Sequence, residues 1–265
     1  MKPPPFKYEA PASVEEALPL LGLDTTVLAG GQSLVPLLNL RLAQPELVVD
    51  LGGIVELDYI RAEDGTLRIG AMTRQVTLER SELVRERWPL LSKAIRLVGH
   101  AQIRSRGTVG GSIAHADPAA ELPVALTALG ARFHLRSSGG TRTVDAADFF
   151  LGPLYTVREP DELLVEIEVP EPVDGAGSGF AEHARTHGDF ATAGAAAIVA
   201  PGAQAAVVLL GAGPIPVRAE AAERALAVGA EPREAAALAA REVEDEHRRA
   251  LCTELARRAI EEAMS

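Results

Sequence analysis

Cysteine is nearly absent from this chain of 265 residues, and long uncharged apolar runs are missing altogether. Cys252, the single cysteine, cannot form an internal disulfide, hold an iron–sulfur cluster or build a cysteine-rich zinc site by itself. We interpret it as a small buried residue. Because no uncharged stretch of about 20 apolar residues occurs, the sequence predicts no membrane-spanning helix.

Basic runs are missing too. The chain has 26 Lys and Arg against 37 Asp and Glu, a net charge of −11, which argues against nucleic acid as a partner. The acidity is typical of a protein kept in solution by its charge. The start, Met1–Lys7, lacks the apolar core of a signal peptide, so we expect a cytoplasmic protein. A hydrophobic content of 47% suffices for one large domain or two to three small ones.

Two neighbouring glycines, Gly30 and Gly31, follow a predicted buried strand over Thr26–Ala29. A helix from Leu34 to about Leu42 and a second strand over Leu47–Leu51 complete a unit of βαβ size. Paired glycines let the backbone turn sharply and bring N–H groups close to a ligand. Ser33 is in position to cap the helix, whose first N–H groups are free to bind an anion.

The middle of the chain predicts a hairpin at Asp64-Gly65, then helices over residues 73–87, 88–98 and 119–129. Residues 100–111 are predicted to be a loop, and strands are predicted over 132–136, 141–144 and 162–169. Gly175–Gly179 is typical of a linker. Three strands and then three helices follow it, which predicts a separate α+β unit.

A second pair of glycines lies in Thr108-Val109-Gly110-Gly111-Ser112-Ile113. Hydroxyls and exposed N–H groups suit a pyrophosphate, and the carboxylates of Asp117 and Glu121 suit ribose or ribityl hydroxyls. Asp117 is equally well explained as a turn residue before Pro118, and Glu121 as a favourable charge in a first helical turn. The spacing fits neither a Rossmann fingerprint nor a P-loop.

Other polar residues carry weaker signals. Arg104 and Arg106 beside the second glycine pair are either solvated or contacts for a phosphate or a partner. None of the six histidines has metal-ligand spacing with a carboxylate, so we predict no metal site.

Together these motifs resemble the FAD-binding subunit of molybdenum hydroxylases, a family that includes medium chains of aerobic carbon monoxide dehydrogenase and the flavin domain of xanthine dehydrogenase. The resemblance rests on Ala29–Leu34, Thr108–Ala114, Asp161–Ile167 and Gly188–Gly194 in this order, and covers essentially the whole chain. It implies an α+β fold of two FAD-binding subdomains, similar to vanillyl-alcohol oxidases, and a C-terminal α+β domain. We expect boundaries at residues 1–52, 53–172 and 173–265.

The resemblance also implies the cofactor site. Residues of the two glycine segments would hold the FAD pyrophosphate, Glu121 would keep a negative charge near the flavin's polar tail, and Leu164 would pack near the isoalloxazine ring. Val98, and Glu182 or His183, stand where some members have an aromatic residue and a lysine. The predicted noncovalent FAD site consists of Ala29, Gly30, Gly31, Gln32, Ser33, Leu34, Thr108, Gly110, Gly111, Ser112, Asp117, Glu121 and Leu164.

Such a subunit would receive electrons from an iron–sulfur subunit and pass them through FAD to NAD, a quinone or another acceptor. The molybdenum cofactor and iron–sulfur clusters would belong to partner chains, in a hetero-oligomer. Two alternatives are a stand-alone FAD-dependent oxidoreductase and a scaffold with a degenerate pocket. The stand-alone enzyme needs an acid or base over the ring, for which His183, His187 and Tyr155 are the candidates.

Overall fold

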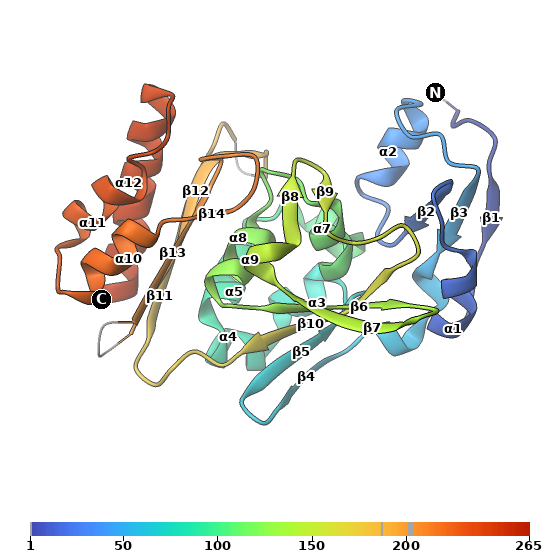
Figure 1. Cartoon of the computed structure of the whole chain (residues 1–265), viewed down its shortest axis with the longest axis horizontal. Helices are drawn as coiled ribbons and strands as arrows, with labels where there is room; N and C mark the ends of the chain where they lie inside the picture. Colours follow the sequence, from blue (N-terminus) through green and yellow to red (C-terminus); the bar gives the residue numbers. More distant parts are fainter. Residues whose placement is uncertain (1, 187, 201–203) are drawn as a thin grey trace.

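Three main β-sheets follow one another along the chain in the computed structural model, which describes residues 2–186, 188–200 and 204–265 (Figure 1). Helices pack between and beside the sheets, so the predicted mixture of helices and strands is confirmed. No helix in these described ranges combines the length and apolar character needed to cross a bilayer.

The first sheet has the order β1 (Lys7–Glu9), β3 (Leu47–Asp50), β2 (Thr25–Leu28), and its two strand pairs are parallel. Helix α2 (Leu34–Asn39) joins β2 to β3, so the predicted βαβ arrangement is confirmed. Helices α1 (Val14–Ala17) and η1 (Leu18–Leu20) lie between β1 and β2.

The predicted start of α2 at Leu34 is confirmed, but its predicted end and its predicted cap are wrong. The helix ends at Asn39 and not near Leu42, and the Ser33 side chain makes no capping hydrogen bond. Ser33 already has a right-handed helical backbone, with φ −97° and ψ −48°, whereas a capping residue is normally extended.

The second sheet is antiparallel, in the order β4 (Ile60–Glu63), β5 (Thr66–Gly70), β10 (Leu163–Pro170), β6 (Arg132–Ser137), β7 (Gly140–Asp145). Short helices η2 (Leu51–Gly53) and η3 (Val55–Leu57) lead into it. The predicted hairpin is confirmed, since Asp64 and Gly65 both have positive φ, as a tight Asp-Gly turn requires.

Three expectations about the helices of this region need correction. The predicted helix 73–87 is two helices, α3 (Gln75–Arg80) and α4 (Glu82–Arg87), because Ser81 is extended and caps the second. The predicted helices 88–98 and 119–129 are shorter, as α5 (Pro89–Ile95) and α8 (Glu121–Ala128).

The predicted loop 100–111 contains α6 (Ala101–Arg106) and the start of α7 (Val109–His115). The Thr108 hydroxyl caps α7 by accepting the Gly111 N–H at 3.1 Å. Two neighbouring glycines disfavour a helix by propensity, so tertiary packing determines this one. Helix α9 (Ala146–Phe149) and the small hairpin β8 (Phe150–Gly152)–β9 (Tyr155–Thr156) follow β7.

The third sheet comprises β11 (Gly177–Ala184), β12 (Ala191–Ala200), β13 (Gln204–Leu210) and β14 (Val217–Arg218). Helices α10 (Glu220–Ala227), α11 (Pro232–Ala239) and α12 (Glu246–Met264) cover one face, and α5 and α8 lie on the other (Figure 1). The predicted order, strands before helices, is confirmed.

The linker expected at Gly175–Gly179 is only partly one, because Gly177 and Gly179 belong to β11. A side chain on either glycine would collide with a carbonyl of α12, that of Ala263 or Ala259, respectively. These glycines therefore serve close packing between strand and helix. One apolar cluster joins Leu122 of α8 to Phe180 and Val208 of the third sheet. This cluster crosses the boundary expected at residue 173, and the three expected boundaries remain predictions.

Candidate functional site

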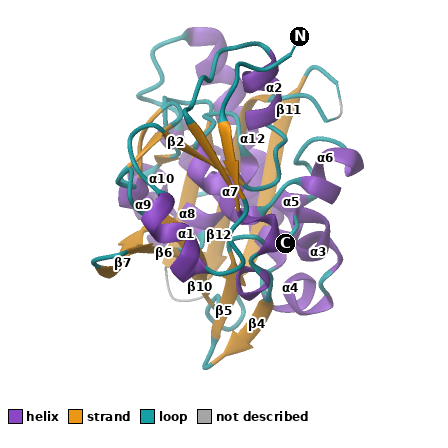
Figure 2. Cartoon of the chain, turned by 90° about the vertical axis from the view of Figure 1, so that its right-hand side faces the viewer, coloured by secondary structure: helices purple, strands orange, loops and turns teal. Residues whose placement is uncertain are grey.

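A cavity of about 670 Å³ lies where the first sheet, the segment from α6 to α8, and β10 meet, with Gly188–Phe190 also on its wall. Figure 2 faces the first sheet and shows β2 and α2 in front of α7. The cavity wall includes every sequence-predicted site residue, namely Ala29, Gly30, Gly31, Gln32, Ser33, Leu34, Thr108, Gly110, Gly111, Ser112, Asp117, Glu121 and Leu164. The structure therefore brings the whole predicted set together, and its role in binding remains a prediction.

The two glycine segments touch. A Cβ on Gly30 would stand 2.5 Å from the Arg106 carbonyl oxygen and 2.8 Å from the Gly107 Cα, closer than real contacts. A Cβ on Gly111 would stand 3.4 Å from the Ala29 Cβ. Gly30 is thus required for the approach of the two segments, which present one surface to the cavity.

The second glycine segment does not offer the bare N–H groups expected from the sequence. The first three N–H groups of α7 already have acceptors inside the protein, namely the Thr73 and Ala71 carbonyls and the Thr108 hydroxyl. Gly110 instead allows the helix to pack on the second sheet, since a Cβ there would lie 2.5 Å from the Ala71 Cβ. The polar side chains that α7 places on the cavity wall are those of Ser112 and His115, and the Ser112 hydroxyl lies within the glycine segment itself.

The first glycine segment keeps its N–H groups available. Within the described residues, the backbone N–H groups of Gly31, Gln32 and Ser33 have no protein acceptor. Gly31 has φ +75°, and the Gln32 side-chain amide donates to the Gly30 carbonyl at 3.1 Å, which closes the turn. Consecutive unpaired N–H groups make a concave surface that suits an anion such as a phosphate.

Carboxyl groups mark another part of the cavity. One Asp117 oxygen accepts the Ala119 N–H at 2.8 Å, so the turn interpretation of this residue is confirmed. Glu121 is only 6% exposed, and burial raises its pKa to about 8, helped by the negative charges of Glu182 and Asp117. At neutral pH Glu121 is therefore mainly a neutral hydrogen-bond donor. The family resemblance, in contrast, implies a negative charge at this residue.

Glu121→Gln is expected to change how stability depends on pH. Because the folded-state pKa is raised above the unfolded value, wild-type Glu121 favours folding at low pH and loses this contribution as pH rises toward about 8. From pH 6 to pH 8 the free energy of unfolding of the wild type should fall by about 2–3 kcal/mol relative to that of the variant. Urea denaturation of both apoproteins at the two pH values measures this, and an equal difference at both would contradict it.

The solvated interpretation of Arg104 is wrong. The residue is only 8% exposed, and its guanidinium pairs with both carboxylate oxygens of Glu79, at 2.9 and 3.0 Å. It also donates to the Val98 and Gly99 carbonyls at 3.0 Å each. Arg104 thus fixes a segment of the cavity wall from behind. Arg106 is exposed, and with Arg74 it borders a second hollow beside the first glycine segment.

Sequence reasoning missed several cavity residues, including Met72, Gln75 and Arg158. The Gln75 side-chain oxygen is buried and has no partner among the described residues. Arg158 lies in the turn before β10 and is half-buried. No motif surrounds these positions, so only the fold could reveal them.

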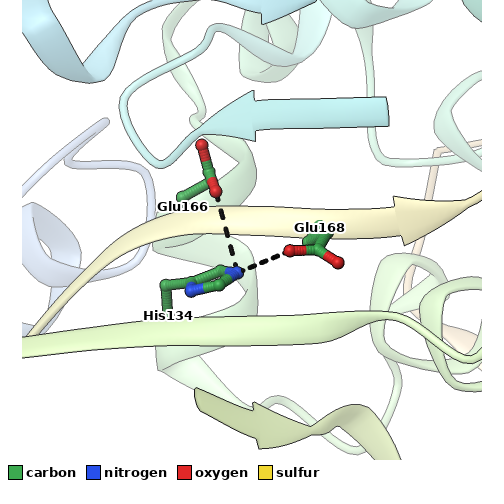
Figure 3. A group of neighbouring side chains, drawn as sticks. All are labelled: His134, Glu166 and Glu168. Atoms are coloured by element: carbon green, nitrogen blue, oxygen red, sulfur yellow. Dashed lines mark hydrogen bonds and ion pairs between the residues drawn. The ribbon is translucent and has the colours of Figure 1, made fainter. Parts of the chain in front are cut away.

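A group of His134, Glu166 and Glu168 on neighbouring strands β6 and β10 has the composition of a metal site (Figure 3). The His134 Nε2 lies 3.0 Å from Glu168 and 3.7 Å from Glu166. Arginines already engage both carboxylates, Arg68 at Glu166 (2.5 Å) and Arg132 at Glu168. Since these cations neutralise the carboxylates, we interpret the group as an ion-pair network on the sheet and not as a metal site.

The acid and base candidates of the stand-alone enzyme are poorly placed. Tyr155 is 65% exposed, His183 is exposed, and neither is on the cavity wall. His187 lies outside the described residues. Val98 does line the cavity.

The cavity fits FAD in size and in chemistry. Its volume falls within the usual range of small-molecule sites, and it combines unpaired N–H groups, a serine hydroxyl, carboxyl groups and apolar walls. The N–H groups and the serine hydroxyl match the diphosphate of FAD. The carboxyl groups match its ribityl and ribose hydroxyls, and the apolar walls match its ring systems.

Comparisons with known proteins agree. Residues 4–172 match the family described as the FAD binding domain in molybdopterin dehydrogenase. The 6-hydroxypseudooxynicotine dehydrogenase complex subunit alpha of Paenarthrobacter nicotinovorans is 44% identical over 234 residues, 85% of this chain and 79% of that protein. The carbon monoxide dehydrogenase medium chain of Hydrogenophaga pseudoflava is 46% identical over 202 residues, 75% of this chain and 70% of that protein.

Solved structures extend the likeness to the whole chain. Carbon monoxide dehydrogenase from Hydrogenophaga pseudoflava superposes with a TM-score of 0.94 at 41% identity, over 100% of this chain and 99% of the other. Quinoline 2-oxidoreductase from Pseudomonas putida 86 gives 0.93 at 37% identity, over 99% and 98%. The chain therefore belongs to the FAD-binding medium subunits of molybdenum hydroxylases, and is a subunit of an FAD-dependent oxidoreductase.

Proposed function

We propose that this chain transfers electrons within a molybdenum hydroxylase complex, from an iron–sulfur subunit through its FAD to NAD, a quinone or another acceptor. FAD, when bound, accepts electrons singly and releases them as a pair. The observation that carries the proposal is the contact between two glycine segments that face one cavity, where the first segment leaves the N–H groups of Gly31–Ser33 unpaired among the described residues. The chain's single cysteine supports placing the clusters, like the molybdenum cofactor, on partner subunits.

The residues divide the work by their chemistry. The N–H groups of Gly31–Ser33 and the Ser112 hydroxyl would hold the diphosphate of FAD. Asp117 and Glu121 would bind ribityl or ribose hydroxyls, with Glu121 as donor at neutral pH. Leu164, which is buried, would pack against the isoalloxazine ring and help to exclude water. We propose noncovalent binding, as the resemblance to the family implies.

Titration of the purified chain with FAD tests this function. We expect flavin fluorescence to be quenched as FAD binds, and acid precipitation to release all the flavin into the supernatant. Absence of binding would overturn the proposal, and flavin in the precipitate would overturn noncovalent attachment. Purification from the native host, where we expect a cytoplasmic hetero-oligomer, tests the partners. Recovery of a fully active chain without molybdenum and iron–sulfur subunits would favour a stand-alone oxidoreductase.

A further inference from the structure

Arg158 is a cavity residue that the proposed function does not yet use. It lies in the turn between β9 and β10, half-buried, on the cavity wall. One terminal nitrogen, Nη1, donates to the Glu159 carbonyl at 2.9 Å and the Glu162 carbonyl at 2.8 Å. Its Nε and Nη2 have no protein acceptor in the described ranges. The guanidinium is thus anchored on one side and has donors to spare on the other.

The positive charge of Arg158 has no partner within ion-pair distance among the described residues. The nearest candidate, Glu162, is already taken, because Arg142 binds both its oxygens at 2.6 and 2.7 Å. One of those oxygens also accepts the Glu159 N–H at 2.8 Å. Burial lowers the pKa of Arg158, yet a guanidinium stays charged in proteins. Glu162, Asp161 and Glu159 act on this charge only from beyond ion-pair distance. A half-buried cation with unused donors therefore favours a ligand group that accepts hydrogen bonds or carries negative charge.

Apolar side chains share the cavity wall with Arg158 and Glu162. Leu51, Met72 and Leu163 line the cavity and belong to one cluster of buried side chains. Leu163 directly follows Glu162, whose carbonyl anchors Arg158. An apolar wall suits the face of a flat ring and not a diphosphate, for which the glycine segments already provide donors. A ligand whose flat ring lies against these side chains can present its electron-rich edge to the spare donors of Arg158.

We propose that Arg158 contacts the isoalloxazine edge of FAD and stabilises the negative charge that the ring gains on reduction. This inference rests on the proposed function. Two electrons from a reductant, in the complex the iron–sulfur partner, and one proton from solvent leave the ring with one net negative charge. A fixed guanidinium beside that charge favours the reduced cofactor over the oxidised one, and so raises the midpoint potential.

Arg158→Gln in the FAD-loaded chain tests the inference by redox titration with a reference dye. At a fixed potential we expect the ratio of reduced to oxidised flavin to fall about tenfold or more, the size of one charged hydrogen bond. A tenfold change corresponds to about 30 mV for a two-electron couple. Arg158→Lys keeps the charge and should recover most of the ratio. The matched control is Arg85→Gln, since Arg85 is exposed and, among the residues that the structure describes, pairs with Glu82 alone.

The outcomes separate the inference from the proposed function. If the wild type binds no FAD, the proposed function fails. If FAD binds and Arg158→Gln leaves the redox ratio unchanged, the inference fails alone. If the variant weakens FAD and ADP binding equally, Arg158 contacts phosphate, which also overturns the inference. Should Arg158→Gln not fold, Arg158→Met, which removes the charge, is compared with Arg158→Lys, which keeps it. A reduced-to-oxidised ratio in Arg158→Lys that is no higher than in Arg158→Met would contradict a role for charge.

Discussion

Gly30→Val is expected to reduce FAD affinity about hundredfold or more. Any side chain at residue 30 meets backbone atoms, the Arg106 carbonyl oxygen and the Gly107 Cα, and these cannot rotate away. The two glycine segments would have to separate, at a cost of about 1–3 kcal/mol for the overpacking. Separation would also misplace the unpaired N–H groups of Gly31–Ser33, and charge-assisted bonds to phosphate depend on their geometry. FAD titration by fluorescence quenching measures the loss.

The control for this prediction is Gly22→Ala, near the same sheet, where an added Cβ meets nothing within 4 Å. It should bind FAD as tightly as the wild type. Thermal unfolding of each apoprotein shows whether Gly30→Val still folds, and Gly30→Ala provides a milder clash if it does not. Unchanged FAD binding in a folded Gly30→Val protein would show that the contact between the glycine segments does not matter for the cofactor.

Local patterns in the sequence predicted much of the fold. The βαβ unit, the Asp-Gly hairpin and the final order of strands and helices depend on periodicity and turn chemistry, which act over a few residues. Helix α7 was missed because its glycines oppose a helix, and the Thr108 cap and contacts with Ala71 outweigh that preference. Gly177 and Gly179 were misread because only the position of α12 gives them their role.

The candidate site shows the same division. The glycine segments and the likeness to a family predicted thirteen site residues, and all thirteen lie on one cavity wall. What these residues offer a ligand was harder to predict. The N–H groups of α7 are consumed by Thr73, Ala71 and the Thr108 side chain, which are contacts across the fold. Likewise, the protonation of Glu121 depends chiefly on its burial and also on the carboxylate of Glu182, and neither is visible in its local sequence.

Arg104→Gln is expected to destabilise the chain by about 3 kcal/mol. The change removes a cation that pairs with Glu79 and donates to the Val98 and Gly99 carbonyls. Breaking a buried pair by removing one partner typically costs about 3–5 kcal/mol, and we take the lower end because the Glu79 side chain is 24% exposed. Urea denaturation at pH 7 measures the loss. Since Val98 and Gly99 line the cavity, weaker FAD binding should accompany it.

The pH dependence distinguishes this structural role from contact with a phosphate. Arg104 holds the pKa of Glu79 below its usual value, so the stability from the pair is present near neutral pH and is lost as the pH falls through the folded-state pKa. The difference between wild type and Arg104→Gln should therefore shrink on acidification. Arg85→Gln, which breaks an exposed pair, should cost less than about 1 kcal/mol. If Arg104→Gln instead lowered FAD affinity and left the apoprotein as stable as before, Arg104 would act on the cofactor directly.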